Sequence, residues 1–324
     1  MPGVLSPETL LKDMNHLWMT LGKQGSSETG MGVLRACTMT LVVVTEALDD
    51  DSALGEIVAA LMPEHPARSI LVRLDPEGGR DLSGRVFAQC WMPFGQRRQI
   101  CCEQIEITAA ERSLADVASL ISPIAAPDLP LVVWCRSAAI AGRPDFWTFA
   151  ATAHKVIVDT GAWPDPAAAV RRLTELAAGG LTLGDFSWTH LTRWREMVSQ
   201  VFENSQYVAR LPDIARVRVR YGQQNLGVMA RYLGAWLVDA LADAGAQAQL
   251  ILDPAGATPS VELSANGFQV ILARQGDRLV TTVDGLSHCA ALPQSTEYLL
   301  LREEVGIIQR DPVFERTLVS AARL

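Results

Sequence analysis

The 324-residue sequence lacks any apolar run long enough to cross a membrane. Its longest runs, Met39–Val44 and Leu129–Trp134, are far shorter than the ~20 residues that a transmembrane helix needs. A positively charged and then apolar leader is also absent, since Glu8, Lys12 and Asp13 fall within the first turns. These absences predict a soluble protein that is not exported, and we expect it in the cytoplasm without a membrane partner.

The sequence also lacks the cysteine and histidine spacings of metal and redox sites. Its six cysteines, at positions 37, 90, 101, 102, 135 and 289, form no C-x-x-C pair, and its five histidines are scattered. With 49% apolar residues, a chain of this length can bury a core without disulfide cross-links. We therefore expect no metal and reduced, mostly buried thiols. A redox-active pair is the alternative, and it requires two cysteine Cα atoms within ~7 Å.

Basic residues are too few for a nucleic-acid partner to be expected. Lys and Arg total 28 against 36 Asp and Glu, which gives a net charge of −8, and a phosphate backbone repels such a chain. The glycines between Gly22 and Gly32 precede a predicted strand, whereas a dinucleotide fingerprint follows one. Met31 stands where a P-loop needs lysine. No nucleophile elbow or kinase signature occurs either, so we assign no catalytic residues and no cofactor.

The first half of the sequence alternates between short apolar strands and helices. Strands are predicted at 33–45, 70–74, 85–91, 99–107, 131–135 and 156–158, and helices at 6–21, 54–61, from 113, 144–153 and 165–177. This alternation predicts an α/β fold whose mainly parallel sheet has flanking helices. The strands on either side of Pro93 and Gly95 are expected to form a hairpin. Adjacent Cys101 and Cys102 should then point to opposite faces of their strand.

The pattern changes after Gly179-Gly180, which we take as a linker at about 179–184 between domains 1–178 and 179–324. The second half predicts a long helix at 188–203, a strand at 215–221, an apolar-striped helix around 229–241, strands at 249–252, 260–264, 268–273 and 278–283, and helices from Ser295 and Pro312. Asn266-Gly267 between two apolar runs is a strong hairpin signal. The prediction is an α+β domain with an antiparallel meander.

Tryptophan and arginine gather in the segment Asp185–Glu196. Trp188, Arg193, Trp194 and Arg195 lie within it, and these two residue types anchor many protein interfaces. Asp185 or Ser187 can cap its helix. Packing in a domain core is the alternative for the tryptophans, and we favour it for Trp188.

Strict alternation at 215–221 places Arg216, Arg218 and Arg220 on one face of a strand. Such a row can receive a carboxylate-rich partner or a phosphate. A solvated face balanced by acidic residues is an equally weighted alternative.

Two further segments have structural explanations. His65–Arg68 fits a rigid entry turn before a strand. Of Glu103 and Gln104, only one is expected to face the core, within a hydrogen-bond network.

A second functional hypothesis is an enzyme or small-ligand site at the carboxyl edge of the first sheet. The polar side chains near that edge would be Thr45, Asp75, Arg136 and Asp159.

Six segments, taken in order, resemble the glucose-6-phosphate dehydrogenase assembly protein family, OpcA. They are Val33–Thr45, Glu64–Arg68, Gln99–Ile105, Pro127–Trp134, Val156–Thr160 and Asp185–Glu196. The resemblance extends from about 30 to 245, and the Asp, Trp, Leu-Thr and Trp-Arg spacing of the last segment is its most specific part. Cys135 and Arg193 depart from the family pattern, which more often has tryptophan at the first position and proline or an apolar residue at the second.

The resemblance implies a non-enzymatic protein that binds glucose-6-phosphate dehydrogenase, the enzyme that opens the oxidative pentose phosphate pathway. Family members favour the active oligomer of that enzyme and thus act as allosteric effectors. Neither catalytic residues nor a cofactor is carried over from the family. The residues that we predict to bind the partner are Trp188, Arg193, Trp194, Arg195, Arg216, Arg218 and Arg220.

Overall fold

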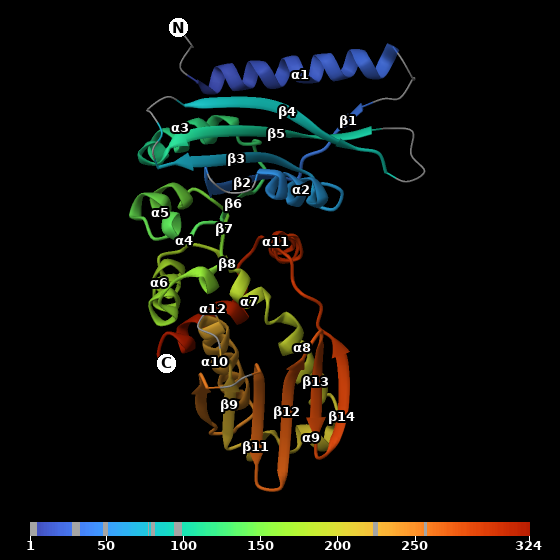
Figure 1. Cartoon of the computed structure of the whole chain (residues 1–324), viewed down its shortest axis with the longest axis vertical. Coiled ribbons are helices and arrows are strands. Elements are labelled where there is room, and N and C mark those ends of the chain that lie inside the picture. Colours follow the sequence, from blue (N-terminus) through green and yellow to red (C-terminus); the bar gives the residue numbers. More distant parts are fainter. Residues whose placement is uncertain are drawn as a thin grey trace. The chain divides into compact units, whose positions relative to one another are not determined.

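The computed structural model describes residues 5–27, 33–47, 51–76, 78, 82–93, 99–222, 226–255 and 258–324. The chain forms two compact units (Figure 1). The first unit comprises Met1–Val158 with Glu297–Gln309, and the second comprises Asp159–Thr296 with Arg310–Leu324. The linker expected at 179–184 lies inside the second unit. The division into domains 1–178 and 179–324 stays a prediction, which concerns the segments that fold independently. None of the described helices combines the length and apolar composition needed to span a membrane.

A mainly parallel sheet forms the centre of the first unit, as the sequence predicts. Its strands follow the order β1-β5-β3-β2-β6-β7, and β4 pairs with β5 in the antiparallel direction. The bounds are β1 Val33–Arg35, β2 Met39–Glu46, β3 Ala67–Asp75, β4 Ser83–Trp91, β5 Gln99–Ala110, β6 Leu131–Cys135 and β7 Lys155–Val158. The β4–β5 pairing confirms the expected hairpin, whose turn at 94–98 lies outside the described residues, as do most of the glycines at 22–32.

The single strand predicted at 33–45 is wrong, because the chain leaves one neighbour and joins another within it. β1 pairs with β5, whereas β2 pairs with β3 and β6. Between them, the Ala36 amide donates to the Cys101 carbonyl and the Thr38 amide donates to the Pro66 carbonyl. These two hydrogen bonds mark the crossing from β5 to β3.

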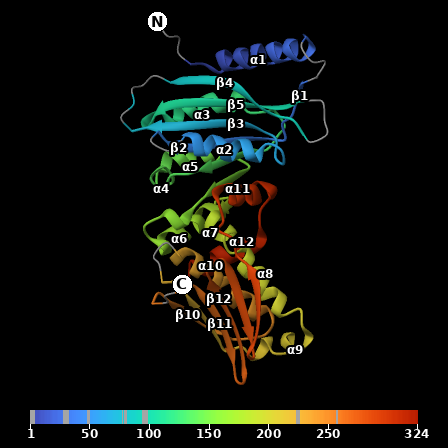
Figure 2. The same cartoon turned by 45° about the vertical axis from the view of Figure 1, so that its right-hand side comes forward.

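Helices cover the first sheet. They are α1 Pro7–Ser27, α2 Asp51–Leu61, α3 Leu114–Ile124, α4 Ala138–Ala141, α5 Pro144–Ala150 and α11 Glu297–Gly306. Pro7 and Pro144 occupy first helical positions, where a missing amide hydrogen costs nothing. Figures 1 and 2 show α1 running along β4, and Leu10 and Met14 of this helix are buried.

Ion pairs tie α11 to the first unit although its chain neighbours belong to the second. The Lys155 ammonium lies 2.5 Å from the Glu304 carboxylate, and both side chains are less than a tenth exposed. The same ammonium donates to the carbonyls of Glu304 and Ile307, each at 2.8 Å. Two further ion pairs, Arg136–Glu297 and Arg302–Glu64, also hold α11, and they are more exposed than the Lys155–Glu304 pair.

The second unit contains a mixed sheet in the order β10-β9-β11-β12-β13-β14. Its strands are β9 Arg216–Arg220, β10 Gln249–Asp253, β11 Ser260–Ala265, β12 Phe268–Gln275, β13 Arg278–Val283 and β14 Leu286–Ala291. The short strand β8, Leu183–Asp185, is not part of this sheet. Strands β11, β12 and β13 form an antiparallel meander as predicted, and the structure adds β14 to it. The strand expected at 249–252, β10, is not part of this meander, because it pairs with β9 in the parallel direction. Gly267 turns the β11–β12 hairpin at a φ of 68°, a backbone region that favours glycine.

The remaining elements of the second unit are helical. They are α6 Pro166–Ala178, α7 Phe186–Thr189, α8 Thr192–Val201, α9 Ser205–Val208, α10 Gly227–Asp243 and α12 Pro312–Ala321. The long helix predicted at 188–203 is wrong. The Leu191 amide bonds to the Trp188 carbonyl only three residues back, and this tightened turn separates α7 from α8.

The register of the second sheet gives it two unlike faces. The inner face carries buried Val217, Val219, Leu263, Val270 and Leu272. Helix α10 packs against it, since a Cβ on Gly234 would lie 2.9 Å from the Leu250 side chain. Figure 2 shows α8 and α9 to one side of the sheet. The outer face carries the alternate residues, which include Arg216, Arg218, Arg220, Glu262 and Ile271, and these are exposed or half-buried.

Candidate functional site

The segment 185–196 is anchored by a buried carboxylate. One oxygen of Asp185 accepts from the amides of Thr160 and Ser187, at 3.1 and 2.9 Å. The other accepts from the hydroxyls of Thr160 and Tyr232, at 2.5 and 2.8 Å. Asp185 thus caps α7, as the sequence suggested, and also links α7 to α10 and to the turn at Thr160. Burial raises the pKa of Asp185 to about 7, against the opposing effect of its hydrogen bonds to Thr160 and Ser187.

This raised pKa makes the second unit less stable as the pH rises from about 4 to about 7. An aspartate in the unfolded chain loses its proton near ~3.9, so between these values the folded state binds more protons. The free energy of unfolding therefore falls across this window and levels off above it. We expect the denaturation midpoint to show this fall in the unmodified protein and a weaker one in Asp185→Asn. The same pH dependence in both proteins would contradict the assignment.

Trp188 packs in the core of the second unit, which confirms the alternative favoured from the sequence. Its ring stacks on Phe314 with centroids 5.5 Å apart and meets Tyr232 edge-on. Its indole N–H donates to Asp311 at 3.2 Å, and only 3% of the residue is exposed. The Arg195 guanidinium lies 3.7 Å above the same ring, where a cation–π contact holds α8 against α7.

The other candidate residues of this segment differ in exposure. Trp194 is 7% exposed. Arg193 is 40% exposed through its side chain and pairs with Glu196 at 2.9 Å. Arg195 also donates to Thr192 at 3.0 Å. Of the four residues, Arg193 offers the most accessible charge, and the tryptophans reach a partner only through the helices that they support.

The three arginines of β9 lie on the outer face of the second sheet, as their alternation predicts. Arg216 is exposed, whereas Arg218 and Arg220 are half-buried. Arg220 approaches Asp253 and Glu262 at 3.5 and 3.9 Å. Among the described residues, the buried Nε of Arg218 has no hydrogen-bond partner.

The balance of charge on this outer face is positive. The strand register places Arg278 on the same face as the three arginines of β9. The acidic residues that it places on this face are Asp253 and Glu262. The whole chain carries a net charge of −8. The outer face is thus a locally basic surface on an acidic protein, and acidic partners are attracted to it.

The polar residues of β5 form a structural network in the first unit. Glu103 lies 2.5 Å from Arg35 and 2.6 Å from Arg68, and Trp18 donates to it at 2.5 Å. Glu103 and Gln104 are only 3% and 5% exposed. The expectation that just one of them is buried is wrong, because both faces of β5 are covered here.

Two of the polar residues expected at the carboxyl edge of the first sheet, Thr45 and Arg136, pack against or pair with neighbouring residues of the described structure. Thr45 is buried, and Arg136 pairs with Glu297 at 2.8 Å while its guanidinium lies over the Trp134 ring. Ser137 donates to Glu46 beside this pair. Asp159, which was placed at this edge from the sequence, belongs to the second unit.

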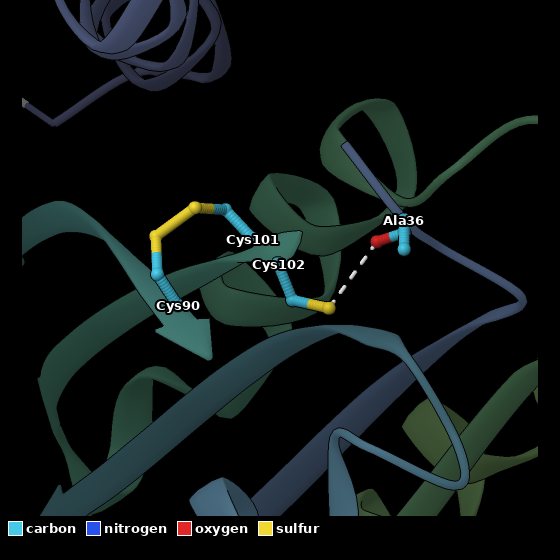
Figure 3. The surroundings of a disulfide bond; sticks show 4 residues. All are labelled: Ala36, Cys90, Cys101 and Cys102. Carbon is cyan, nitrogen blue, oxygen red and sulfur yellow. Dashed lines mark hydrogen bonds between the residues drawn. A yellow bond between two sulfur atoms is a disulfide. The ribbon is translucent and has the colours of Figure 1, made fainter. Parts of the chain in front are cut away.

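Cys90 and Cys101 form a disulfide, so the expectation that the cysteines are reduced is wrong for this pair (Figure 3). The antiparallel register places them directly opposite each other on β4 and β5, with Cα atoms 4.1 Å apart. Cys102 points to the other face, as predicted, and donates to the Ala36 carbonyl at 3.2 Å. Burial raises the pKa of Cys102 to about 12, so this thiol stays protonated. Among the described residues, no three His, Cys, Asp or Glu side chains gather as metal ligands would.

Comparison with protein families decides which group the chain falls in. Residues 58–175 match the model described as the glucose-6-phosphate dehydrogenase subunit N-terminal domain, and residues 181–318 match the model of the corresponding C-terminal domain. The chain belongs to the OpcA family. This confirms the resemblance seen in the sequence and extends it over the C-terminal meander.

Two curated relatives named OpcA, both described by name as OxPP cycle proteins, are similar to part of the chain. The protein from Nostoc punctiforme is 26% identical over 174 residues, which are 53% of this chain and 37% of the relative. The protein from Synechocystis sp. is 24% identical over 195 residues, or 59% and 40%. The alignments therefore span about two fifths of the length of these OpcA proteins.

Solved structures with a similar arrangement include two oxidoreductases. KijD10, a 3-ketoreductase from Actinomadura kijaniata, has a TM-score of 0.48 at 12% identity, over 88% of this chain and 95% of its own. A dehydrogenase from Chromobacterium violaceum also has a TM-score of 0.48, at 9% identity, over 90% and 92%. Similarity at this level assigns neither an activity nor a ligand to the OpcA chain.

Proposed function

We propose that this chain binds glucose-6-phosphate dehydrogenase and favours its active oligomer, without catalysing a reaction of its own. The supporting observation is that both matched family domains are described as parts of a glucose-6-phosphate dehydrogenase subunit. A binding protein shifts an equilibrium between oligomers only if it binds one state more tightly than the other. We further propose that it acts in the cytoplasm, alongside that enzyme.

The outer face of the second sheet is the proposed contact surface. Arginine forks pair with carboxylates through two parallel hydrogen bonds, so Arg216, Arg218 and Arg220 suit an acidic patch on the dehydrogenase. Arg193 adds a second accessible cation on α8. Within this proposal Trp188, Trp194 and Arg195 act indirectly, by holding α8 in place.

The proposal is tested by titrating the dehydrogenase of the same organism with this protein. Initial rates are measured across glucose 6-phosphate concentrations, with size-exclusion profiles of the same mixtures. A lower apparent KM, or a larger complex that contains both proteins, is the expected result. Unchanged kinetics together with separate elution, under both reducing and oxidising conditions, would refute the proposal.

Neutralising the arginine row should weaken dehydrogenase binding while leaving the fold intact. We expect the triple variant Arg216→Gln, Arg218→Gln, Arg220→Gln to lose about 10-fold or more in affinity and to show a weaker salt dependence. The matched control is Arg172→Gln, an exposed arginine on α6 that pairs with Glu175. Affinity is measured by calorimetry and folding by thermal unfolding. Equal affinities for the triple variant and the control would exclude this face as the contact.

A further inference from the structure

A cleft of about 910 Å³ opens within the second unit, and no part of the proposed function uses it. Its walls come from segments distant in the sequence, namely the turn after Asp159, helices α7 and α8, the start of α10, β12 and the segment 292–295. This volume lies within the range of small-molecule binding sites, and the exposed lining of the cleft is more polar than apolar. The chemistry of its polar groups indicates what the cleft can bind.

An arginine lines the cleft. Arg274 continues the row of inner-face residues Phe268, Val270 and Leu272 of β12, and unlike them it is exposed. Its Nε donates to the Gly276 carbonyl at 3.1 Å, and within the described part of the chain it forms no ion pair. The terminal N–H groups of its guanidinium are therefore suited to binding an anion.

His190 lines the same cleft. Burial lowers the pKa of its imidazole below the usual value, the charge of Asp159 opposes this effect, and the charge of Arg274 adds to it. The imidazole is therefore neutral at pH 7, with one nitrogen donating and the other accepting. His190 thus supplies a hydrogen-bond donor to the cleft without adding charge.

Hydrogen-bond acceptors also line the cleft. The Asp159 carboxylate accepts from the Gly161 amide at 3.0 Å and from the Ser187 hydroxyl at 3.4 Å. An ionised carboxylate only accepts hydrogen bonds, so Asp159 is the kind of group to which the hydroxyls of a ligand donate. Gln294 and Ser295 add an amide and a hydroxyl to the lining.

The rest of the wall is apolar and aromatic. Trp194, Tyr221 and Met229 line both the cleft and a recess of about 70 Å³ that continues from it towards Leu233 and Val261. Flat aromatic surfaces suit the C–H face of a sugar ring or the face of a base. The cleft therefore combines an anion receptor, hydroxyl acceptors and a surface for a ring.

We propose that this cleft binds a phosphorylated sugar, either free or as part of a nucleotide. The phosphate lies against Arg274 and His190, the sugar hydroxyls against Asp159 and the 292–295 segment, and the ring against Trp194 and Tyr221. The proposal is independent of dehydrogenase binding, because the site lies on the inner side of the sheet and is tested without the enzyme.

The test is calorimetry on the full chain with ribose 5-phosphate, glucose 6-phosphate, adenosine monophosphate, inorganic phosphate and glucose. We expect at least one of the first three to bind about 10-fold or more tightly than both inorganic phosphate and glucose, because only these ligands combine a phosphate with a sugar. Tighter binding of adenosine monophosphate than of ribose 5-phosphate identifies a nucleotide, and the reverse identifies a free sugar phosphate. No saturable binding of any phosphorylated sugar, or equal binding of glucose, would overturn the proposal.

Arg274→Gln is expected to reduce the affinity for the bound sugar phosphate by about 10-fold or more. The matched control is Arg278→Gln, since register places Arg278 opposite Gln275 and thus on the outer face. Thermal unfolding of both variants shows that they are folded. Equal affinities of the two variants would rule out Arg274 as the anion receptor and the proposal with it.

Discussion

Asp185→Ala is expected to destabilise the second unit by about 4 kcal/mol, since each buried donor left without an acceptor costs about 1–3 kcal/mol. The substitution removes the acceptor of two backbone amides, those of Thr160 and Ser187, and of the Thr160 and Tyr232 hydroxyls. The hydroxyls can rotate towards other acceptors, but the amides cannot. Equilibrium denaturation followed by tryptophan fluorescence measures the loss, because Trp188 reports on the same core.

Asp165→Ala is the matched control. Asp165 also caps a helix, α6, and accepts from the amides of Ala167 and Ala168 at 2.9 and 3.0 Å, but its hydrogen bonds are exposed to water. Water replaces the lost acceptor at this site, so we expect a cost of only about 1 kcal/mol. Similar losses for the two variants would show that Asp185 is an ordinary helix cap rather than the central link of this unit.

Lys155→Met is expected to cost the first unit about 3–5 kcal/mol, because it leaves the Glu304 carboxylate buried without its counter-charge. Two carbonyls, those of Glu304 and Ile307, also lose a donor. The double variant Lys155→Met, Glu304→Leu should recover much of this loss, since an apolar pair avoids the desolvation of two charges. Free energies of unfolding of the single and double variants provide the test.

Arg302→Ala is the control for this second prediction. Arg302 links the same helix, α11, to Glu64 at 2.6 Å, but both side chains are nearly half exposed. Surface pairs of this kind contribute about 0–1 kcal/mol. If Lys155→Met cost no more than Arg302→Ala, the buried pair would not be what holds α11 in the first unit.

Local signals in the sequence predicted the elements well wherever neighbouring residues determine the structure. The strand at 131–135 has the predicted bounds, and Asp165 with Pro166 starts α6 as expected. The meander of the second unit follows from its alternation and from Asn266-Gly267. The predicted bounds were wrong where pairing with a strand distant in the sequence determines where a strand ends. At 33–45, for example, β1 pairs with β5 whereas β2 pairs with β3, so the predicted strand is two strands.

The candidate site was only partly predictable for the same reason. Alternation alone places Arg216, Arg218 and Arg220 on one face, whereas the burial of Trp188 depends on Phe314, far along the chain. The alternation at 268–274 could have indicated Arg274, because it places this cation at the end of the apolar row 268, 270 and 272. The predicted hairpin could likewise have indicated the Cys90–Cys101 disulfide, because the two cysteines occupy matching positions on its two strands.

The placement of α11 in the first unit has a consequence for the order in which the protein can mature. A ribosome makes a chain from its amino end, so Lys155 emerges 149 residues before Glu304, its partner in the buried pair. The intervening residues include most of the second unit. The first unit thus acquires this ion pair only after most of the second unit has been synthesised, and a chain that stops before Glu304 lacks it.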